Sequence, residues 1–211
     1  MVIRSQRLIV PAGVVRLRPL SRDDHGEWRR IRMADAEVLR RVEPTTGGDW
    51  DEEHSRRNFR AMLRRNRAAE NTGVGAVAAI ELDGDFVGQL TLGGMRPFPE
   101  SCCWAGYWVS SEHWGGGVAT AALALACDHA TALGLRRIEA TVLAANDGSR
   151  KVLERCGFRE IGVARELFHI DGAWRDHVVL DRLADGPGGG SAVDRLVSSG
   201  FARRQAANPG E

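Results

Sequence analysis

Three consecutive glycines, Gly115 to Gly117, constrain this chain more than any other feature of its sequence. They follow an apolar stretch, 102–109, that is typical of a strand, and they precede an Ala-rich stretch, 118–133, that predicts a helix closed by Gly134. Glycine has no Cβ, so a ligand can approach the backbone N–H groups of such a loop closely. The N-terminus of the helix adds about half a positive charge at the same place. This order of elements therefore predicts an anion site, and a diphosphate is the expected ligand.

Two common diphosphate motifs fit the loop poorly. The phosphate-binding loop of NTPases needs Lys and then Ser or Thr after its last glycine, whereas Val118 follows here. A dinucleotide-binding fingerprint fits Gly115, Gly117 and Thr120 only loosely. Its acidic residue would be Glu139, which falls at the start of the next predicted strand rather than at its end. Neither nucleotide hydrolysis nor dinucleotide binding is indicated.

A third pattern fits better. Residues 114–119 resemble the coenzyme A loop of GNAT acetyltransferases, Q/R-x-x-G-x-G/A, with Gly117 and Ala119 at the small positions. Trp114 replaces the usual Gln or Arg, as in the RimJ/RimL branch of that family. The resemblance implies that backbone amides of this loop hold the pyrophosphate of acetyl-CoA, the implied cosubstrate. The cofactor-binding residues that it implies are Trp108, Val109, Ser110, Trp114, Gly115, Gly116, Gly117, Val118, Ala119, Thr120, Asn146 and Ser149.

Two further segments resemble the same family. Residues 135–158 match its next motif, in which a strand, N-x-x-S, a helix and G-F follow in that order. The matching positions are Asn146, Ser149, Gly157 and Phe158. Residues 170–177 are similar to the last hairpin of RimJ-type enzymes, and the whole resemblance covers 7–183. It implies an α/β GNAT fold, whose central sheet is mixed, mostly antiparallel and seven-stranded, with about four flanking helices.

The periodicity of the remaining chain predicts the same plan. Residues 1–184 are expected to form the GNAT domain, and 185–211 a Gly-rich linker and a C-terminal tail. Apolar residues in 193–201 could form one or two amphipathic turns, but a mobile tail is favoured. The expected elements are one broken strand or two at 7–10 and 14–20, helices near 21–43 and 51–67, strands at 74–82, 86–95 and 102–109, a helix at 118–133, a strand at 137–143, a helix at 149–156, and a hairpin of 158–170 and 174–183.

Composition excludes several other classes of protein. A chain of 211 residues with a net charge of +1 fits a single domain and excludes a general attraction to nucleic acid. No long apolar run or signal peptide is present, so the protein is expected to be soluble and cytoplasmic, without a membrane partner. The six histidines show no metal-ligand spacing, so no metal is expected. Buried, reduced thiols are expected at Cys102, Cys103, Cys127 and Cys156.

The resemblance also implies how the chemistry would run. The strands that end near Ser110 and Leu143 would splay apart, and their free backbone groups would bind the pantetheine arm. The backbone N–H near Val109 would polarise the acetyl carbonyl. A donor of this kind is typically worth about 3 kcal/mol of the barrier.

Several polar side chains are candidates for catalysis. Ser149 would hydrogen-bond the departing sulfur and pass it a proton, or it would simply cap the helix that it begins. Asn146 would hold the pantetheine or be a turn residue. Glu166 and Glu43 are candidate bases acting through water, and the preferred interpretation of either one alone is a solvated surface carboxylate. His177 matches the RimJ pattern, although a histidine in a strand is more often structural.

The RimJ resemblance implies acetylation of the α-amine of a ribosomal protein, with alanine as the expected N-terminal residue. Residues 41–44 resemble the W-E-P segment of that branch, with Val42 in place of Trp, which leaves the acceptor open. A small-molecule amine acceptor and a non-catalytic acetyl-CoA-binding ribosome-assembly factor are the alternatives. The arginines of 56–67 could contact rRNA or an acidic surface, or form a solvated face. A monomer or a homodimer is expected.

Overall fold

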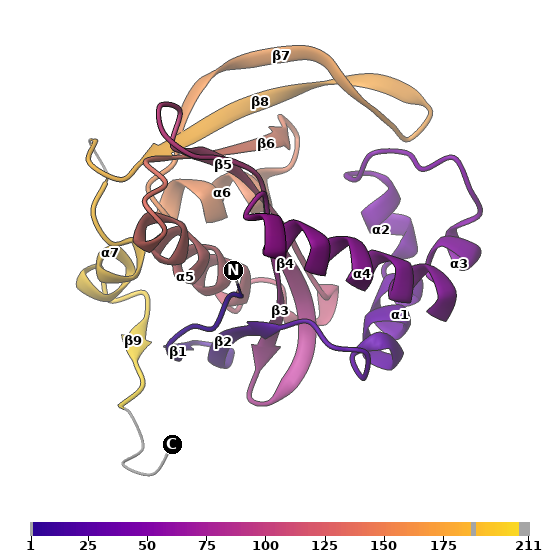
Figure 1. The fold of residues 1–211 in the computed structure, drawn as a ribbon, viewed down its shortest axis with the longest axis horizontal. Coiled ribbons are helices and arrows are strands. Elements are labelled where there is room, and N and C mark those ends of the chain that lie inside the picture. Colours follow the sequence, from indigo (N-terminus) through magenta and orange to yellow (C-terminus); the bar gives the residue numbers. More distant parts are fainter. Residues whose placement is uncertain (1, 187–188, 207–211) are drawn as a thin grey trace.

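The computed structural model describes residues 2–186 and 189–206, which form a nine-stranded sheet with helices on both faces (Figure 1). The strand order is β7-β8-β6-β5-β4-β3-β2-β1-β9. The strands are β1 (Leu8–Val10), β2 (Gly13–Pro19), β3 (Ala76–Leu82), β4 (Asp85–Arg96), β5 (Cys102–Val109), β6 (Arg137–Leu143), β7 (Arg159–Ile170), β8 (Ala173–Leu183) and β9 (Arg203–Arg204). The helices are α1 (His25–Ala34), α2 (Ala36–Arg40), α3 (Trp50–Glu53), α4 (Arg56–Thr72), α5 (Val118–Ala132), α6 (Asp147–Arg155) and α7 (Ala192–Ser198).

The predicted α/β plan with a mixed, mostly antiparallel sheet is confirmed. Every neighbouring pair of strands is antiparallel except β5 and β6, which run parallel. The sheet has nine strands rather than the expected seven, because β1 and β2 are separate strands and β9 pairs with β1. Seven helices are present in the described residues instead of about four.

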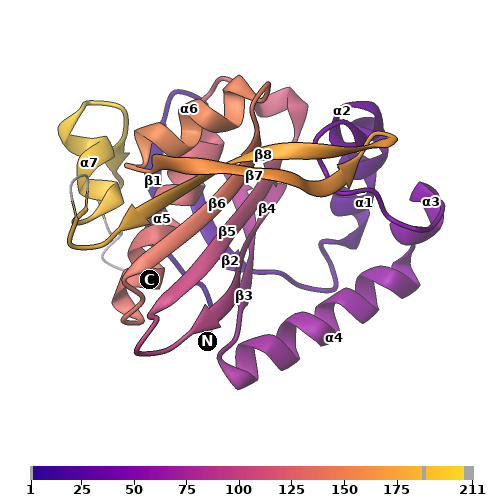
Figure 2. The same cartoon turned by 90° about the horizontal axis from the view of Figure 1, so that it is seen from above.

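Two apolar cores hold the helices against the two faces of the sheet. The larger core contains most of α5, which is apolar all round and lies between the sheet and α7. The smaller core joins α1 and α4 to the opposite face through Trp28, Ile31, Phe59 and Leu63. Figure 2 shows α5 and α6 on one side of the sheet and α1 and α4 on the other. No helix of the described residues is long and apolar enough to cross a membrane.

Both predicted N-terminal helices are interrupted, and local hydrogen bonds explain where. The first ends at Asp35, whose buried carboxylate accepts hydrogen bonds from the Ser111 backbone N–H at 2.9 Å and from Ser111 Oγ at 2.5 Å. The second restarts at Ser55, whose hydroxyl accepts from the Asn58 N–H and so caps α4. The chain therefore bends at each junction, and the first junction is fixed to the loop that follows β5.

The expectation of a mobile tail is wrong for residues 189–206, which fold onto the domain. Helix α7 buries Ala192, Val193 and Leu196 almost completely against α5. Asp128 of α5 accepts hydrogen bonds from Ser191 Oγ at 2.5 Å, from the Ala192 N–H at 2.6 Å and from the Val193 N–H at 3.3 Å. The amphipathic pattern prevails because α5 offers an apolar face that would otherwise be exposed. Residues 187–188 and 207–211 of the predicted linker and tail lie outside the described residues.

Replacing Asp128 tests how this helix is held. Asp128→Ala removes three hydrogen bonds to the start of α7, and it should lower the free energy of unfolding by about 1–2 kcal/mol in urea denaturation. Asp128→Asn keeps one acceptor oxygen and should lower the free energy of unfolding by a smaller amount. The exposed Glu37→Ala serves as a control and should change little. Equal stability of the wild type and Asp128→Ala would show that another interaction holds the tail.

Candidate active site

A gap between β5 and β6 forms the centre of the site. Their pairing covers only three residue pairs, from Cys102 with Arg137 to Trp104 with Glu139. Beyond these pairs the two strands border a cavity of about 290 Å³, which also reaches α6, β8 and the loop after α2. This arrangement matches the splay predicted from the sequence.

Backbone groups of β5 face this gap. The Ser110 N–H donates to the Val87 carbonyl at 2.8 Å, which fixes the hydrogen-bonding phase of β5 against β4. Because antiparallel pairs alternate, Tyr107 and Val109 then direct their N–H and C=O groups away from β4, toward β6. The Val109 carbonyl accepts from Trp114 Nε1 at 2.9 Å. The Val109 N–H remains directed at the gap, as the predicted carbonyl-polarising role requires.

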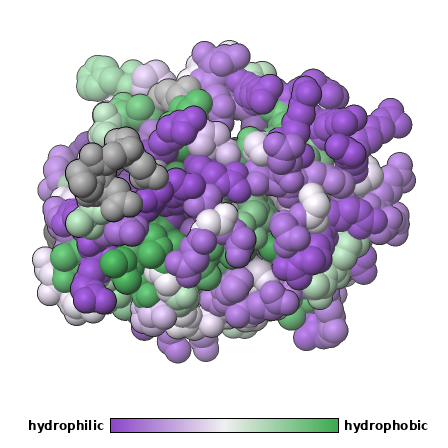
Figure 3. Space-filling model, turned by 90° about the horizontal axis from the view of Figure 1, so that it is seen from below, coloured by the Kyte–Doolittle hydropathy of each residue, from purple (hydrophilic) through white to green (hydrophobic). Residues whose placement is uncertain are grey.

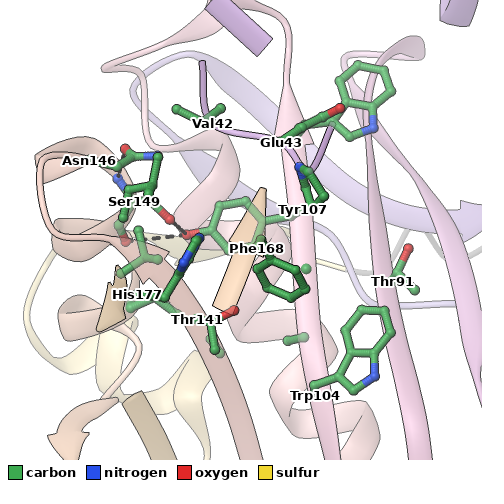
Figure 4. A pocket seen from close by; sticks show the side chains of 18 of the residues that line it. Val42, Glu43, Thr91, Trp104, Tyr107, Thr141, Asn146, Ser149, Phe168 and His177 are labelled. Carbon is green, nitrogen blue, oxygen red and sulfur yellow. Dashed lines mark hydrogen bonds between the residues drawn. The ribbon is translucent and has the colours of Figure 1, made fainter. Parts of the chain in front are cut away.

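Ser149 and Tyr107 form a hydroxyl pair at the edge of the cavity (Figure 4). Their oxygen atoms are 2.9 Å apart, and either can donate. The cap of α6 is Asn146, whose Oδ1 accepts from the Ser149 N–H at 3.1 Å. Of the two roles left open for Ser149, the structure therefore gives the helix cap to Asn146 and leaves the Ser149 hydroxyl available to the cavity.

Tyr107 is a candidate that the sequence analysis missed. Burial raises the pKa of its phenol, so the hydroxyl stays protonated and can donate to Ser149 Oγ. The alternation of β5 places Tyr107 on the same face as the core residues Cys103, Ala105 and Val109. A tyrosine on a core face needs a partner for its hydroxyl, and this signal could have identified it from the sequence.

Glu43 lies at the acceptor end of the cavity, but both of its oxygens are bound by one cation. Arg32 donates to Glu43 Oε1 and Oε2 at 2.5 Å each, and its Nε donates to His54 Nε2 at 2.9 Å. Burial is the main cause that lowers the pKa of His54, so the ring is neutral and can accept this bond. The geometry shows a positioned carboxylate, and its role as a base stays a prediction.

Aromatic rings enclose the Arg32 guanidinium. Its carbon lies 4.8 Å from the centroid of a Trp50 ring and 5.3 Å from that of Trp108. Trp50 Nε1 also donates to the Arg32 carbonyl at 3.0 Å. These contacts fix α1, α3 and the loop with Glu43 relative to β5, so the acceptor end of the cavity is rigidly built.

Glu166 is not brought to the cavity. Its side chain is exposed on β7, and its N–H donates to Asp176 Oδ1 at 2.8 Å. By contrast His177 lines the cavity and is 3% exposed, with Nδ1 3.0 Å from the Arg175 carbonyl. The Phe168 ring meets the His177 ring edge-on at 5.1 Å. Figure 4 shows His177 and Phe168 beside the hydroxyl pair.

The glycine loop lies at the carboxyl end of β5, and either backbone conformation or close neighbours disfavour a side chain at each of its three glycines. Gly115 and Gly117 have φ values of 78° and 87°, which disfavour other residues. A Cβ at Gly116 would lie 2.6 Å from that of Ala12, whose N–H donates to the Gly116 carbonyl at 3.1 Å. Gly117 is the N-cap of α5, and no side chain of the described residues caps this helix.

The first amides of α5, those of Val118, Ala119 and Thr120, are therefore free to bind an anion. A narrow, uncapped glycine cradle of this kind fits a pyrophosphate. Of the other predicted cofactor residues, Trp108, Asn146 and Ser149 line the cavity itself. Within the described residues no group of three or more His, Cys, Asp or Glu could hold a metal ion.

Comparison with known proteins identifies the family. Residues 15–159 match the acetyltransferase (GNAT) domain, which is more than half of the chain. The chain therefore belongs to the GNAT acetyltransferase family, which confirms the predicted family and, with it, the acyltransferase class and the acetyl-CoA cosubstrate of that family.

Individual relatives refine this assignment. RimJ of Mycobacterium smegmatis, solved in complex with CoA-disulfide, is 45% identical, with a TM-score of 0.92 over 96% of this chain and 97% of that chain. The ribosomal-protein-S5-alanine acetyltransferase of Vibrio fischeri shares the fold, with 22% identity and a TM-score of 0.74 over 82% of this chain and 94% of that chain. The probable N-acetyltransferase YjcK of Bacillus subtilis is 46% identical over 76 residues, 36% of this chain, and the chain spans only 42% of that relative. The predicted RimJ/RimL likeness is confirmed.

Substitutions in the hydroxyl pair test the site. Ser149→Ala should lower kcat about 100-fold, as expected for loss of a group that assists proton transfer, and leave acetyl-CoA affinity unchanged. Tyr107→Phe should lower kcat less, and the double variant should resemble Ser149→Ala because the two hydroxyls act as one unit. Thr91→Val, which removes another hydroxyl from the same cavity, is the control. Full turnover by Ser149→Ala in steady-state assays would remove Ser149 from the mechanism.

Proposed function

We propose that this protein is an acetyl-CoA-dependent Nα-acetyltransferase that acts on the N-terminal residue of a protein substrate. We further propose a ribosomal protein with N-terminal alanine as its acceptor, which is what the RimJ/RimL resemblance implies. The observation that supports this most is the gap between β5 and β6. One cavity there combines an inward-facing backbone N–H, a hydroxyl pair and a rigid wall for the acceptor.

When bound, acetyl-CoA supplies an acetyl thioester as the electrophile and a thiol as the leaving group. The amides at the start of α5 would hold its pyrophosphate, and the inward-facing backbone groups of Tyr107 and Val109 would hold its pantetheine arm as an added strand does. The Val109 N–H would donate to the carbonyl oxygen as negative charge develops there. One such donor contributes about 3 kcal/mol to lowering the barrier.

The hydroxyl pair would act on the leaving sulfur. Burial keeps Tyr107 protonated, and with Tyr107 donating to Ser149 Oγ the Ser149 proton would be free to point into the gap. There it would hydrogen-bond the sulfur while the C–S bond breaks and the new C–N bond forms, in one ternary complex. The proton that the amine releases balances the one that the thiol takes up, so no other reactant is needed.

An α-amine suits this site better than a lysine amine. Its reference pKa is near 8, so about a tenth of it is neutral at pH 7, whereas a lysine with a pKa near 10.4 is almost wholly charged. Among the described residues that line this cavity, Glu43 is the one carboxylate, and Arg32 binds both of its oxygens, so no unpaired carboxylate is there for stronger base catalysis. We propose that water beside Glu43 removes the proton, and that Glu166, which lies outside the cavity, takes no part.

The acceptor would enter past the loop after α2. A second cavity of about 300 Å³ shares Glu43 and Pro44 with the first and extends to Trp50 and the β7–β8 turn at Asp171. Two cavities that share lining residues can accommodate a chain of several residues. This favours a peptide N-terminus over the alternative of a small-molecule amine. Val42, 39% exposed, lines the first cavity where the RimJ/RimL branch has Trp, which leaves more room for the acceptor.

A non-catalytic acetyl-CoA-binding ribosome-assembly factor is the second alternative, and it would keep the same loop and gap. The intact Ser149–Tyr107 pair favours catalysis, because simple binding of the cofactor does not require it. A cytoplasmic location and a monomeric or homodimeric state stay predictions.

Mass spectrometry of a peptide panel tests the proposal. After incubation with enzyme and acetyl-CoA, we expect acetylation of the α-amine of peptides beginning with Ala, and less with Ser, Thr or Met. Internal lysines and small amines such as spermidine serve as controls and should stay unmodified. Acetylation confined to the small amines would overturn the protein-substrate assignment. Acetyl-CoA binding without any product would support the non-catalytic alternative.

A further inference from the structure

Helix α4 presents a concentration of positive charge that the active site does not use. Its exposed arginines are Arg56, Arg57, Arg60, Arg64, Arg65 and Arg67. In the described part of the chain none of these six has an ion-pair partner, although many arginines elsewhere do. The charge is local, because the whole chain has a net charge of only +1.

Five of these arginines form one stripe. At 3.6 residues per turn, Arg56, Arg57, Arg60, Arg64 and Arg67 fall within about 100° of the helix circumference and extend over about 16 Å. We call these five residues the arginine stripe. The neighbouring, apolar side of α4 is buried in the core, with Phe59 at 1% and Leu63 at 6% exposure. All five arginines of the stripe are nevertheless exposed to solvent, and Figure 3 shows a mostly hydrophilic surface on the right, the side of α1 to α4.

The stripe opposes the stability of its own helix. Arg56 and Arg57 occupy the first helical turn, where the helix dipole disfavours positive charge, and this turn contains no acidic residue. Arg60 has a like charge four residues away on each side, at Arg56 and Arg64, and such pairs are also destabilising. An arrangement that violates two local rules without compensation is expected mainly at functional surfaces.

We propose that the arginine stripe docks the phosphate backbone of a nucleic acid, with RNA as the expected source. Arginine guanidinium groups bind phosphate oxygens in a bidentate manner. Protein interfaces also use arginine, but they surround it with apolar and aromatic residues, which the stripe lacks. A membrane surface is disfavoured as well, because the apolar face of α4 is already buried in the core.

The position of the stripe gives it a role in acceptor delivery, and this consequence rests on the proposed function. Arg56 follows α3, and Trp50 at the start of α3 lines the second cavity. Trp50 also contacts Arg32, which holds Glu43 in the first cavity. A nucleic acid bound along α4 would therefore hold a protein attached to it close to the opening through which its N-terminus enters.

Matched triple variants test the stripe by fluorescence anisotropy. The probes are a labelled 12-nucleotide single-stranded RNA, the same sequence as duplex RNA, and a DNA duplex of equal length. Arg57→Gln/Arg60→Gln/Arg64→Gln should weaken binding of the single strand at least tenfold at low salt. It should also reduce the slope of log K against log salt by about 2, since each phosphate contact contributes about 0.7 for single strands. The control, Arg22→Gln/Arg159→Gln/Arg165→Gln, changes the net charge equally at exposed positions and should behave like the wild type.

The proposal would be overturned if the wild type bound no nucleic acid, or if both triple variants lost RNA affinity equally. Tight binding of polyglutamate in place of nucleic acid would also overturn it. If the protein preferred the DNA duplex, the stripe would still be a phosphate-docking surface, but its ligand would be DNA and the assignment of RNA would be wrong. Thermal denaturation should show that the stripe variant is folded. The stripe variant should acetylate a free peptide as fast as the wild type does. If none of the proteins acetylates a peptide, the proposed function is contradicted, but the proposal of a docking surface is not.

Discussion

Early termination of the pairing between β5 and β6 is the constraint on which the rest of the site depends. After Trp104 the two parallel strands stop exchanging hydrogen bonds, and backbone groups of β5 that a continuous sheet would use are left facing a cavity. Unpaired backbone groups away from water are unfavourable unless a ligand satisfies them. The unpaired backbone groups of β5 therefore make the gap suitable for binding a ligand. It also brings together α6, with Ser149, and β5, with Tyr107, two elements that a closed sheet would separate.

Two rigid supports hold the ends of the gap. At the acceptor end, Arg32 joins α1, the Glu43 loop, α3 and β5 through a bidentate ion pair, a hydrogen bond to neutral His54 and contacts with two tryptophans. At the cofactor end, the glycine loop packs on the β1–β2 turn, and a Cβ at Gly117 would lie 3.2 Å from Phe201 of the folded tail. Cofactor and acceptor would thus meet between parts that need little rearrangement, which favours a well-aligned transfer.

The sequence predicted the features that depend on short-range pattern. The strand, glycine loop and helix around Gly117, the N-x-x-S motif and the order of the elements all follow from neighbouring residues. Features that depend on distant partners could not be predicted in this way. Tyr107 meets Ser149 across 42 residues, and Arg32 meets His54 across 22. The tail was predicted to be mobile because it is a short chain terminus that follows a Gly-rich linker. Its helix is stabilised by Asp128, 63 residues from Ser191, and by the apolar surface of α5.

The binding of acetyl-CoA in the gap is best tested by a crystal structure of the protein with this cosubstrate. The pyrophosphate should lie on the amides of Val118 to Thr120, the pantetheine arm along the free edge of β5, and the thioester carbonyl within hydrogen-bonding distance of the Val109 N–H. The sulfur should then lie beside Ser149 Oγ. A cofactor bound outside the gap, or a thioester turned away from both Val109 and Ser149, would contradict this mode of binding.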